Sequence, residues 1–160
     1  MGKAQFEARL IPVISDTAEV IGKKAYVAEG EHEITCVSMG NPHCVLFVDE
    51  VDNLELSKIG PAFENDSMFP ERVNTEFVKI IDGRTLKMRV WERGSGETLA
   101  CGTGACAVVS AAVKNGICPA GEDIKVILLG GELTVNYTDD RVLMTGPATK
   151  VFEGTIRESL

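Results

Sequence analysis

The sequence lacks long hydrophobic runs, clusters of basic residues and any export signal. No apolar stretch approaches the roughly 20 residues of a membrane-spanning helix, and the amino terminus lacks the charged and then apolar pattern of a secretory signal. Asp and Glu number 24 against 16 Lys and Arg. Because nucleic acids and anionic membranes are bound by clustered cations, we expect neither as a partner.

The sequence also lacks the spacing of a zinc-binding motif and the features of a disulfide framework. The cysteines are odd in number, and without an export signal a set of disulfides is not expected. Only two histidines, His32 and His43, are present, and Cys101 and Cys106 lack the spacing of a zinc knuckle. We therefore predict reduced thiols, no metal ion and a cytoplasmic protein. The five cysteines are Cys36, Cys44, Cys101, Cys106 and Cys118.

What is present is mostly the pattern of short strands separated by turn residues. Residues 29–31 lie between two apolar runs and predict one hairpin. Asp82-Gly83 predicts a second, since Asp-Gly is typical of tight hairpin turns. The expected strands cover residues 25–28, 34–39, 44–48, 75–81, 85–91, 124–129, 133–137, 142–144 and 149–156.

Two segments are predicted to be helical. Residues 53–59 form a short amphipathic helix that Gly60-Pro61 should end. Residues 103–115 form a longer helix, ended by Gly116, whose side chains are mostly small or apolar all the way round. Such a helix is normally buried on all sides. The sequence therefore predicts the α+β class, with a strongly curved, mostly antiparallel β-sheet or barrel wrapped around one central buried helix.

Cys101 lies where a glycine-rich turn enters this buried helix. The first N–H groups of a helix lack partners within it, and the helix dipole adds partial positive charge. Both effects favour a thiolate, so we expect the pKa of Cys101 to lie below the free value of about 8.5. The same N–H groups can hold a carboxylate. The alternative is a tight connection in which Cys101 only packs.

Charged side chains close to Cys101 in the sequence favour a reactive site. Glu92 and Arg93 lie on the same connection, and a carboxylate and a guanidinium beside a thiolate form a charged site rather than a core. Two further polar clusters lie beside apolar strands, one containing Asn41 and His43 and the other Asn74. Taken singly, each of these three residues also fits a loop or turn.

Four ordered motifs together resemble the diaminopimelate epimerases. They are residues 39–45 (MGNPHCV), 69–74 (FPERVN), 92–98 (ERGSGET) and 100–107 (ACGTGACA). Residues 144–148 (MTGPA) also resemble the closing strand of that family. The resemblance covers nearly the whole chain, and four motifs in order are more specific than any one of them.

The resemblance implies two similar domains, each a β-structure around a central helix, with the substrate in the cleft between them. It implies an isomerase that interconverts LL- and meso-diaminopimelate, in lysine and cell-wall precursor biosynthesis, without a cofactor. One cysteine thiolate removes the α-hydrogen, and a second thiol delivers a proton to the opposite face.

The resemblance also implies roles for individual residues. Cys101 resembles the carboxyl-terminal catalytic cysteine, and His43 and Glu92 resemble positions that support the thiol chemistry. Gly102 and Thr103 resemble the backbone donors that hold the α-carboxylate. The side chains that resemble substrate-binding positions are Asn41, Asn74, Glu92 and Arg93.

One part of the family pattern is missing. The family's other cysteine lies in an amino-terminal motif of the form Asn-x-x-x-x-Cys-Gly-Asn-Gly-x-Arg, and no such stretch exists here. Residues 1–3 resemble the middle of a full-length epimerase. We therefore expect residues 1–160 to form a single carboxyl-terminal domain that is inactive alone, with the amino-terminal domain as a missing partner. A homodimer also remains possible.

Two alternatives stay open from the sequence. One is a related isomerase of the same fold, such as a proline racemase or a phenazine-type isomerase, although residues 92–98 together with 41–43 favour the epimerase. The other is a non-catalytic binding module that kept the fold.

Overall fold

The computed structural model describes residues 1–157 and contains one large sheet, two α-helices and a short 3₁₀ helix. The sheet has the order β1-β2-β3-β4-β5-β7-β8-β9, and β6 pairs with β5. Its strands are β1 (Lys23–Val27), β2 (Gly30–Ser38), β3 (Pro42–Phe47), β4 (Asn74–Asp82), β5 (Thr85–Glu92), β6 (Gly96–Glu97), β7 (Asp123–Leu128), β8 (Gly131–Tyr137) and β9 (Val142–Thr145). The helices are η1 (Ala8–Leu10), α1 (Leu56–Glu64) and α2 (Gly102–Lys114).

The sheet confirms the α+β class and the mostly antiparallel pairing. Only β3–β4 and β5–β7 run parallel, and each parallel pair is joined by a connection that contains a helix. Within the described residues β1 and β9 are the two ends of the strand order, so the sheet is open. The barrel that was expected as an alternative to a sheet is therefore not confirmed.

Both predicted hairpins are present. β4 and β5 pair antiparallel across Asp82-Gly83. β1 and β2 pair across a turn at Ala28 and Glu29, slightly earlier than expected, where both residues adopt positive φ of 50° and 63°. Gly30 itself begins β2. The short strand β6 and the helix η1 were not predicted.

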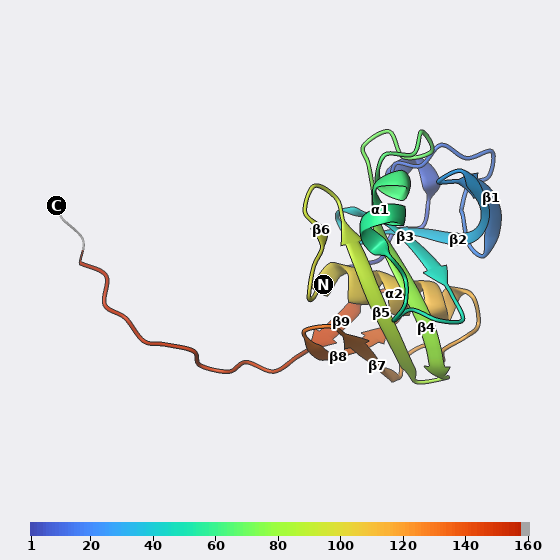
Figure 1. Ribbon diagram of the computed structural model, residues 1–160. Helices are drawn as coiled ribbons and strands as arrows, with labels where there is room; N and C mark the ends of the chain where they lie inside the picture. The colour runs from blue at the N-terminus through green and yellow to red at the C-terminus, as the bar shows by residue number, and fades with distance from the viewer. Residues whose placement is uncertain (158–160) are drawn as a thin grey trace.

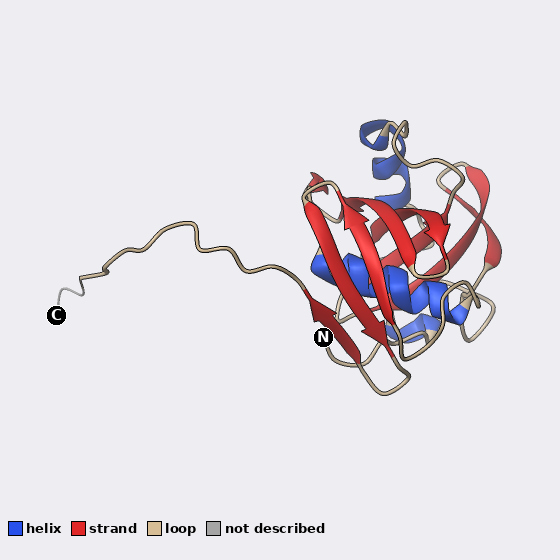
Figure 2. Cartoon of the chain, turned by 90° about the horizontal axis from the view of Figure 1, so that it is seen from below, coloured by secondary structure: helices blue, strands red, loops and turns tan. Residues whose placement is uncertain are grey.

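Alternating side chains give the central strands two apolar faces. Val45 and Val78 pack in the cluster that contains α2, whereas Leu46 and Phe77 pack in the cluster that contains α1. Figure 1 shows α2 crossing behind β4 and β5, and Figure 2 shows the same arrangement from below. The alternation of period two therefore decides which side chains of β3, β4 and β5 face α2.

Helix α2 confirms the prediction for residues 103–115 to within one residue at each end. Its side chains from Gly104 to Ala112 are all buried, and it contacts β2, β3, β4, β5, β7, β8 and β9. Small residues such as Ala107 and Ala111 let the strands approach the helix closely. Asn115 caps the helix, and Gly116 follows in the left-handed conformation with φ of 71°.

The expected end of the first helix was wrong. Helix α1 continues through Gly60 and Pro61 to Glu64. Pro61 lies inside the helix and removes one N–H from its hydrogen-bond ladder, whereas Gly60 lies directly against the Trp91 ring. Packing of the sheet on the helix thus outweighs the two residues that normally end one.

The expected last strand at residues 149–156 was also wrong. β9 ends at Thr145, and the chain then extends away from the sheet (Figures 1 and 2), leaving Val151, Phe152 and Ile156 exposed. Pro147 lacks an N–H group and interrupts pairing just beyond β9.

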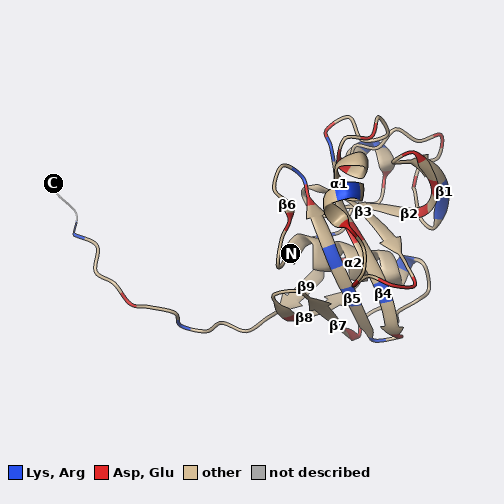
Figure 3. Ribbon diagram, viewed as in Figure 1, with Lys and Arg blue, Asp and Glu red and all other residues tan. Residues whose placement is uncertain are grey.

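Charged residues are mixed in sign over the described part of the molecule. Figure 3 shows Lys and Arg interspersed with Asp and Glu, and ion pairs such as Lys79–Glu50 (2.9 Å) and Arg89–Glu97 (2.7 Å) join them. Within residues 1–157, no helix is long and apolar enough to cross a membrane.

The contact between Gly60 and Trp91 gives a first prediction. A Cβ added at Gly60 would lie 2.3 Å from the Trp91 ring, whereas one added at Gly83 would have its nearest neighbour at 3.8 Å. Alanine favours a helix by about 1 kcal/mol over glycine, but overpacking costs about 1–3 kcal/mol. Gly60→Ala should therefore lower the free energy of unfolding measured in urea, while Gly83→Ala should change it little. Equal stability of the two variants would contradict the close packing of α1 on Trp91.

Candidate active site

The register of β3 and β4 brings three polar side chains to the face that carries α2. β3 and β4 run parallel, with His43 beside Asn74. Because Val45 and Val78 face α2, the alternation also turns His43, Asn74 and Glu76 toward that helix. All three are buried, and they lie where the amino-terminal end of α2 meets the sheet.

The centre of the site is a buried pair formed by His43 and Glu76. Nδ1 of His43 lies 2.6 Å from Oε1 of Glu76, and both side chains are fully buried. Nε2 of His43 lies 3.0 Å from Oδ1 of Asn41. Both ring nitrogens therefore lie within hydrogen-bond distance of an oxygen, one from Glu76 and one from Asn41.

Glu76 was not singled out from the sequence. Its Oε2 has no hydrogen-bond partner among the described residues, although it is buried. A buried polar atom without a partner is costly. The available signal was a carboxylate directly before the apolar pair Phe77-Val78, at the position that faces α2 together with Val78.

Asn41 connects this pair to the helix that carries the thiol. Its Nδ2 donates to Oγ1 of Thr103 (3.3 Å), and that oxygen lies 3.5 Å from Sγ of Cys101. A Cβ at Gly104 would lie 2.8 Å from Oε1 of Glu76, so the absence of a side chain at Gly104 lets the carboxyl reach the start of α2. Residues predicted from two separate motifs, 39–45 and 100–107, thus form one connected cluster.

Cys101 occupies the expected position at the start of α2, but the expected direction of its pKa was wrong. It is the N-cap residue, and its Sγ accepts a hydrogen bond from the N–H of Gly104 at 3.3 Å. Burial is the main cause that raises the pKa of Cys101 to about 11; the charges of Glu76 and Glu92 add to the rise, and the bonds from Thr103 and Gly104 oppose it. At neutral pH the group is therefore a thiol.

The turn after β5 holds Glu92 and Arg93 beside this cluster. Asn74 accepts a hydrogen bond from the backbone N–H of Arg93 (2.9 Å) and donates one to the carbonyl of Pro42 (2.8 Å). Glu92 accepts a hydrogen bond from the hydroxyl of Thr98. Asn74 therefore ties the turn to β3.

The remaining cysteines lie away from this arrangement of polar groups. Cys106 is fully buried in the core around α2, and burial raises its pKa to about 11. Cys36 and Cys44 face each other across β2 and β3 on the side that faces away from α2. All five thiols are free, and among residues 1–157 no group of three or more His, Cys, Asp or Glu side chains is placed to hold a metal ion.

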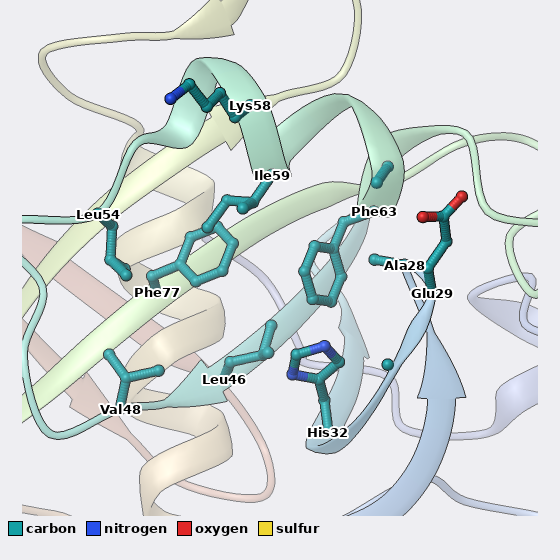
Figure 4. Close-up of a pocket in the computed structure, with 12 residues that line it drawn as sticks. Ala28, Glu29, His32, Leu46, Val48, Leu54, Lys58, Ile59, Phe63 and Phe77 are labelled. Atoms are coloured by element: carbon teal, nitrogen blue, oxygen red, sulfur yellow. The ribbon is translucent and has the colours of Figure 1, made fainter.

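A separate pocket of about 480 Å³ opens on the face of the sheet that carries α1. Figure 4 shows His32, Leu46, Phe63 and Phe77 around it, between α1 and the strands β2, β3 and β4. None of its lining residues belongs to the cluster around Cys101. The pocket and the polar cluster are therefore different features of the molecule.

The sequence of the chain matches the diaminopimelate epimerase family. The family model described as diaminopimelate epimerase matches residues 35–151. The chain is 51% identical to a diaminopimelate epimerase of Methanococcus maripaludis over 158 residues and 52% identical to one of Acetivibrio thermocellus over 159 residues. Each match covers 98% of this chain and 56% of the relative. A solved Pseudomonas aeruginosa structure described as a predicted epimerase is 22% identical, with a TM-score of 0.48, and the match covers 95% of this chain and 57% of that one.

The raised pKa of Cys101 gives a second prediction. Because the charge of Glu92 disfavours the thiolate, Glu92→Gln should lower the pKa of Cys101 and speed its alkylation by iodoacetamide at pH 9. Peptide mass mapping separates Cys101 from the other thiols. Glu97→Gln is the matched control, since Glu97 lies in the same small hairpin but pairs with Arg89. An unchanged Cys101 rate in Glu92→Gln, or a wild-type pKa below 8.5, would contradict this electrostatic account.

Proposed function

The chain belongs to the diaminopimelate epimerase family, and on that premise we propose that it supplies one of two catalytic thiols for the inversion of diaminopimelate at an α-carbon. The observation that supports this proposal is the position of the Cys101 thiol at the start of α2. Thr103 and Asn41 connect the thiol to the buried His43–Glu76 pair. A general acid for proton delivery needs a positioned, protonated group, and Cys101 meets both conditions.

The raised pKa supports a donor role for Cys101 in the resting site. As a thiol it delivers a proton to the α-carbon from one face, leaving a thiolate that the N–H of Gly104 stabilises. In the reverse direction the thiolate must form first. The α-ammonium group of a bound substrate would offset the negative charges of Glu76 and Glu92 that now raise the pKa.

Substrate binding is proposed for groups on both sides of Cys101. The N–H groups of Gly102 and Thr103 precede the hydrogen-bond ladder of α2, so they are available to the α-carboxylate. The guanidinium of Arg93 suits a second carboxylate at the distal end of the substrate. Asn74 has both ends of its amide bonded to backbone, so its main role is to position Arg93.

The second thiol is proposed to come from a domain outside these residues. The chain spans about half the length of the relatives it matches, and Leu99 and Met144, which flank the start of α2, are exposed apolar residues. We propose that residues 1–160 are one domain, with the sheet curved around α2 as a central helix, and that the partner domain covers this face. We also propose a cytoplasmic enzyme that needs no metal or organic cofactor.

Exchange of the α-hydrogen of diaminopimelate for solvent deuterium tests this function. The chain alone should give negligible exchange, and the full two-domain enzyme should give it readily. In that enzyme, Cys101→Ala should reduce exchange from one face by on the order of 10²–10⁴-fold, because a positioned acid or base contributes about that much.

Two controls accompany this measurement. Cys106→Ala removes a thiol from the same helix but outside the cluster, so exchange should persist. Proline is the control substrate. Robust epimerisation by the isolated chain would overturn the two-domain proposal, and turnover of proline but not of diaminopimelate would overturn the proposed substrate.

A further inference from the structure

Glu64 is a buried carboxylate outside the cluster around Cys101, and it receives hydrogen bonds from three different segments. It is the last residue of α1, and its side chain is only 9% exposed. Oε1 accepts from Nη1 of Arg72 (3.0 Å) and from the backbone N–H of Gly94 (2.8 Å). Oε2 accepts from Nε1 of Trp91 (2.7 Å). A carboxylate with three donors of this kind is strongly fixed.

The neighbours of Glu64 direct these donors toward it. The Trp91 ring lies against Gly60, one turn earlier in α1, which leaves its indole N–H pointing along the helix to Glu64. Gly94 adopts φ of 79°, a left-handed conformation that glycine tolerates and other residues rarely adopt. In this conformation the N–H of Gly94 donates to the Glu64 carboxylate at 2.8 Å.

Two side chains thus hold consecutive backbone N–H groups of the turn that follows β5. Asn74 accepts from the N–H of Arg93, and Glu64 accepts from the N–H of Gly94. Arg93 also donates from Nη1 to the carbonyl of Glu71 at 2.8 Å. Together these bonds fix where the Arg93 side chain leaves the backbone, beside the Cys101 cluster.

We propose that Glu64 is a positioning residue for the substrate, acting through the Gly94 N–H to hold Arg93 and Glu92 in place. This inference rests on the proposed function, since it requires Arg93 to bind the distal carboxylate. Glu64 touches no reacting atom. Its effect is on substrate affinity, because the distal contacts are the same in the ground state and the transition state.

The three hydrogen bonds to Glu64 require a carboxylate at this position rather than an amide. All three partners of Glu64 are donors, and a glutamine would turn an NH₂ group toward at least one of them. Glutamine is nearly equal to glutamate in size. In Glu64→Gln, however, the NH₂ group of the amide would face one of the three donors and could not accept its hydrogen bond. Glu64→Asp keeps the charge but is one methylene shorter, so it cannot reach the indole and the Gly94 N–H together.

The first arm of the test needs no substrate. Amide hydrogen exchange at Gly94, followed by NMR in the chain itself, should be about 10- to 100-fold faster in Glu64→Gln than in wild type, as expected for the loss of a charge-assisted bond. Arg72→Gln is the matched control, because it removes the most exposed of the three partners and keeps the bond to Gly94. Its Gly94 exchange should stay within about two-fold of wild type.

The second arm uses the two-domain enzyme and separates binding from chemistry. In Glu64→Gln the KM for diaminopimelate should rise about ten-fold or more with kcat changed little, and Arg72→Gln should leave both near wild type. If Glu64→Gln does not fold, Glu64→Asp should show the same raised KM with a nearly unchanged kcat.

The outcomes distinguish this inference from the proposed function. Unchanged Gly94 exchange, or faster Gly94 exchange with an unchanged KM, would overturn the role of Glu64. A fall in kcat and folding stability at constant KM would make Glu64 merely structural and overturn it equally. A wild-type enzyme without activity on diaminopimelate would instead overturn the proposed function, while the exchange arm would still report whether Glu64 holds the turn.

Discussion

The fully buried contact between His43 and Glu76, 2.6 Å long, is the interaction on which the rest of the site depends. It joins two adjacent parallel strands, and it turns the imidazole so that Nε2 meets Asn41. Removing one partner of a buried hydrogen bond leaves the other polar group without a partner, at a cost of about 1–3 kcal/mol. Asn41 is therefore held in a fixed position, and Thr103 connects it to Cys101.

The same carboxyl also shapes the chemistry of the thiol. Burial, and then the charges of Glu76 and Glu92, disfavour a negative sulfur, so the start of the helix does not by itself produce a thiolate. A protonated Cys101 fits the proton delivery proposed above. Positive charge added by a bound substrate would instead favour the thiolate that the proposed proton removal requires. The electrostatic balance at Cys101 is thus set by the strands as much as by α2.

Local sequence patterns predicted what depends on neighbours along the chain. The Asp82-Gly83 hairpin, the buried α2 and the placement of Cys101 at its start all follow from turn residues, periodicity and caps. Contacts between distant segments were not predictable in this way. Packing against Trp91 lets helix α1 continue beyond Pro61. Burial raises the pKa of Cys101, where the sequence predicted that it would be lowered. Glu76 stayed unnoticed because its importance comes from facing His43, which only the register of β3 and β4 reveals.

The most direct test of this account is the protonation of the His43 ring in the folded protein, read by nitrogen and proton NMR on a sample labelled with ¹⁵N. The structure predicts a slowly exchanging proton on Nδ1, bonded to Glu76. A His43 ring whose Nδ1 carries no proton would contradict the buried pair, and with it the link from the sheet to Cys101.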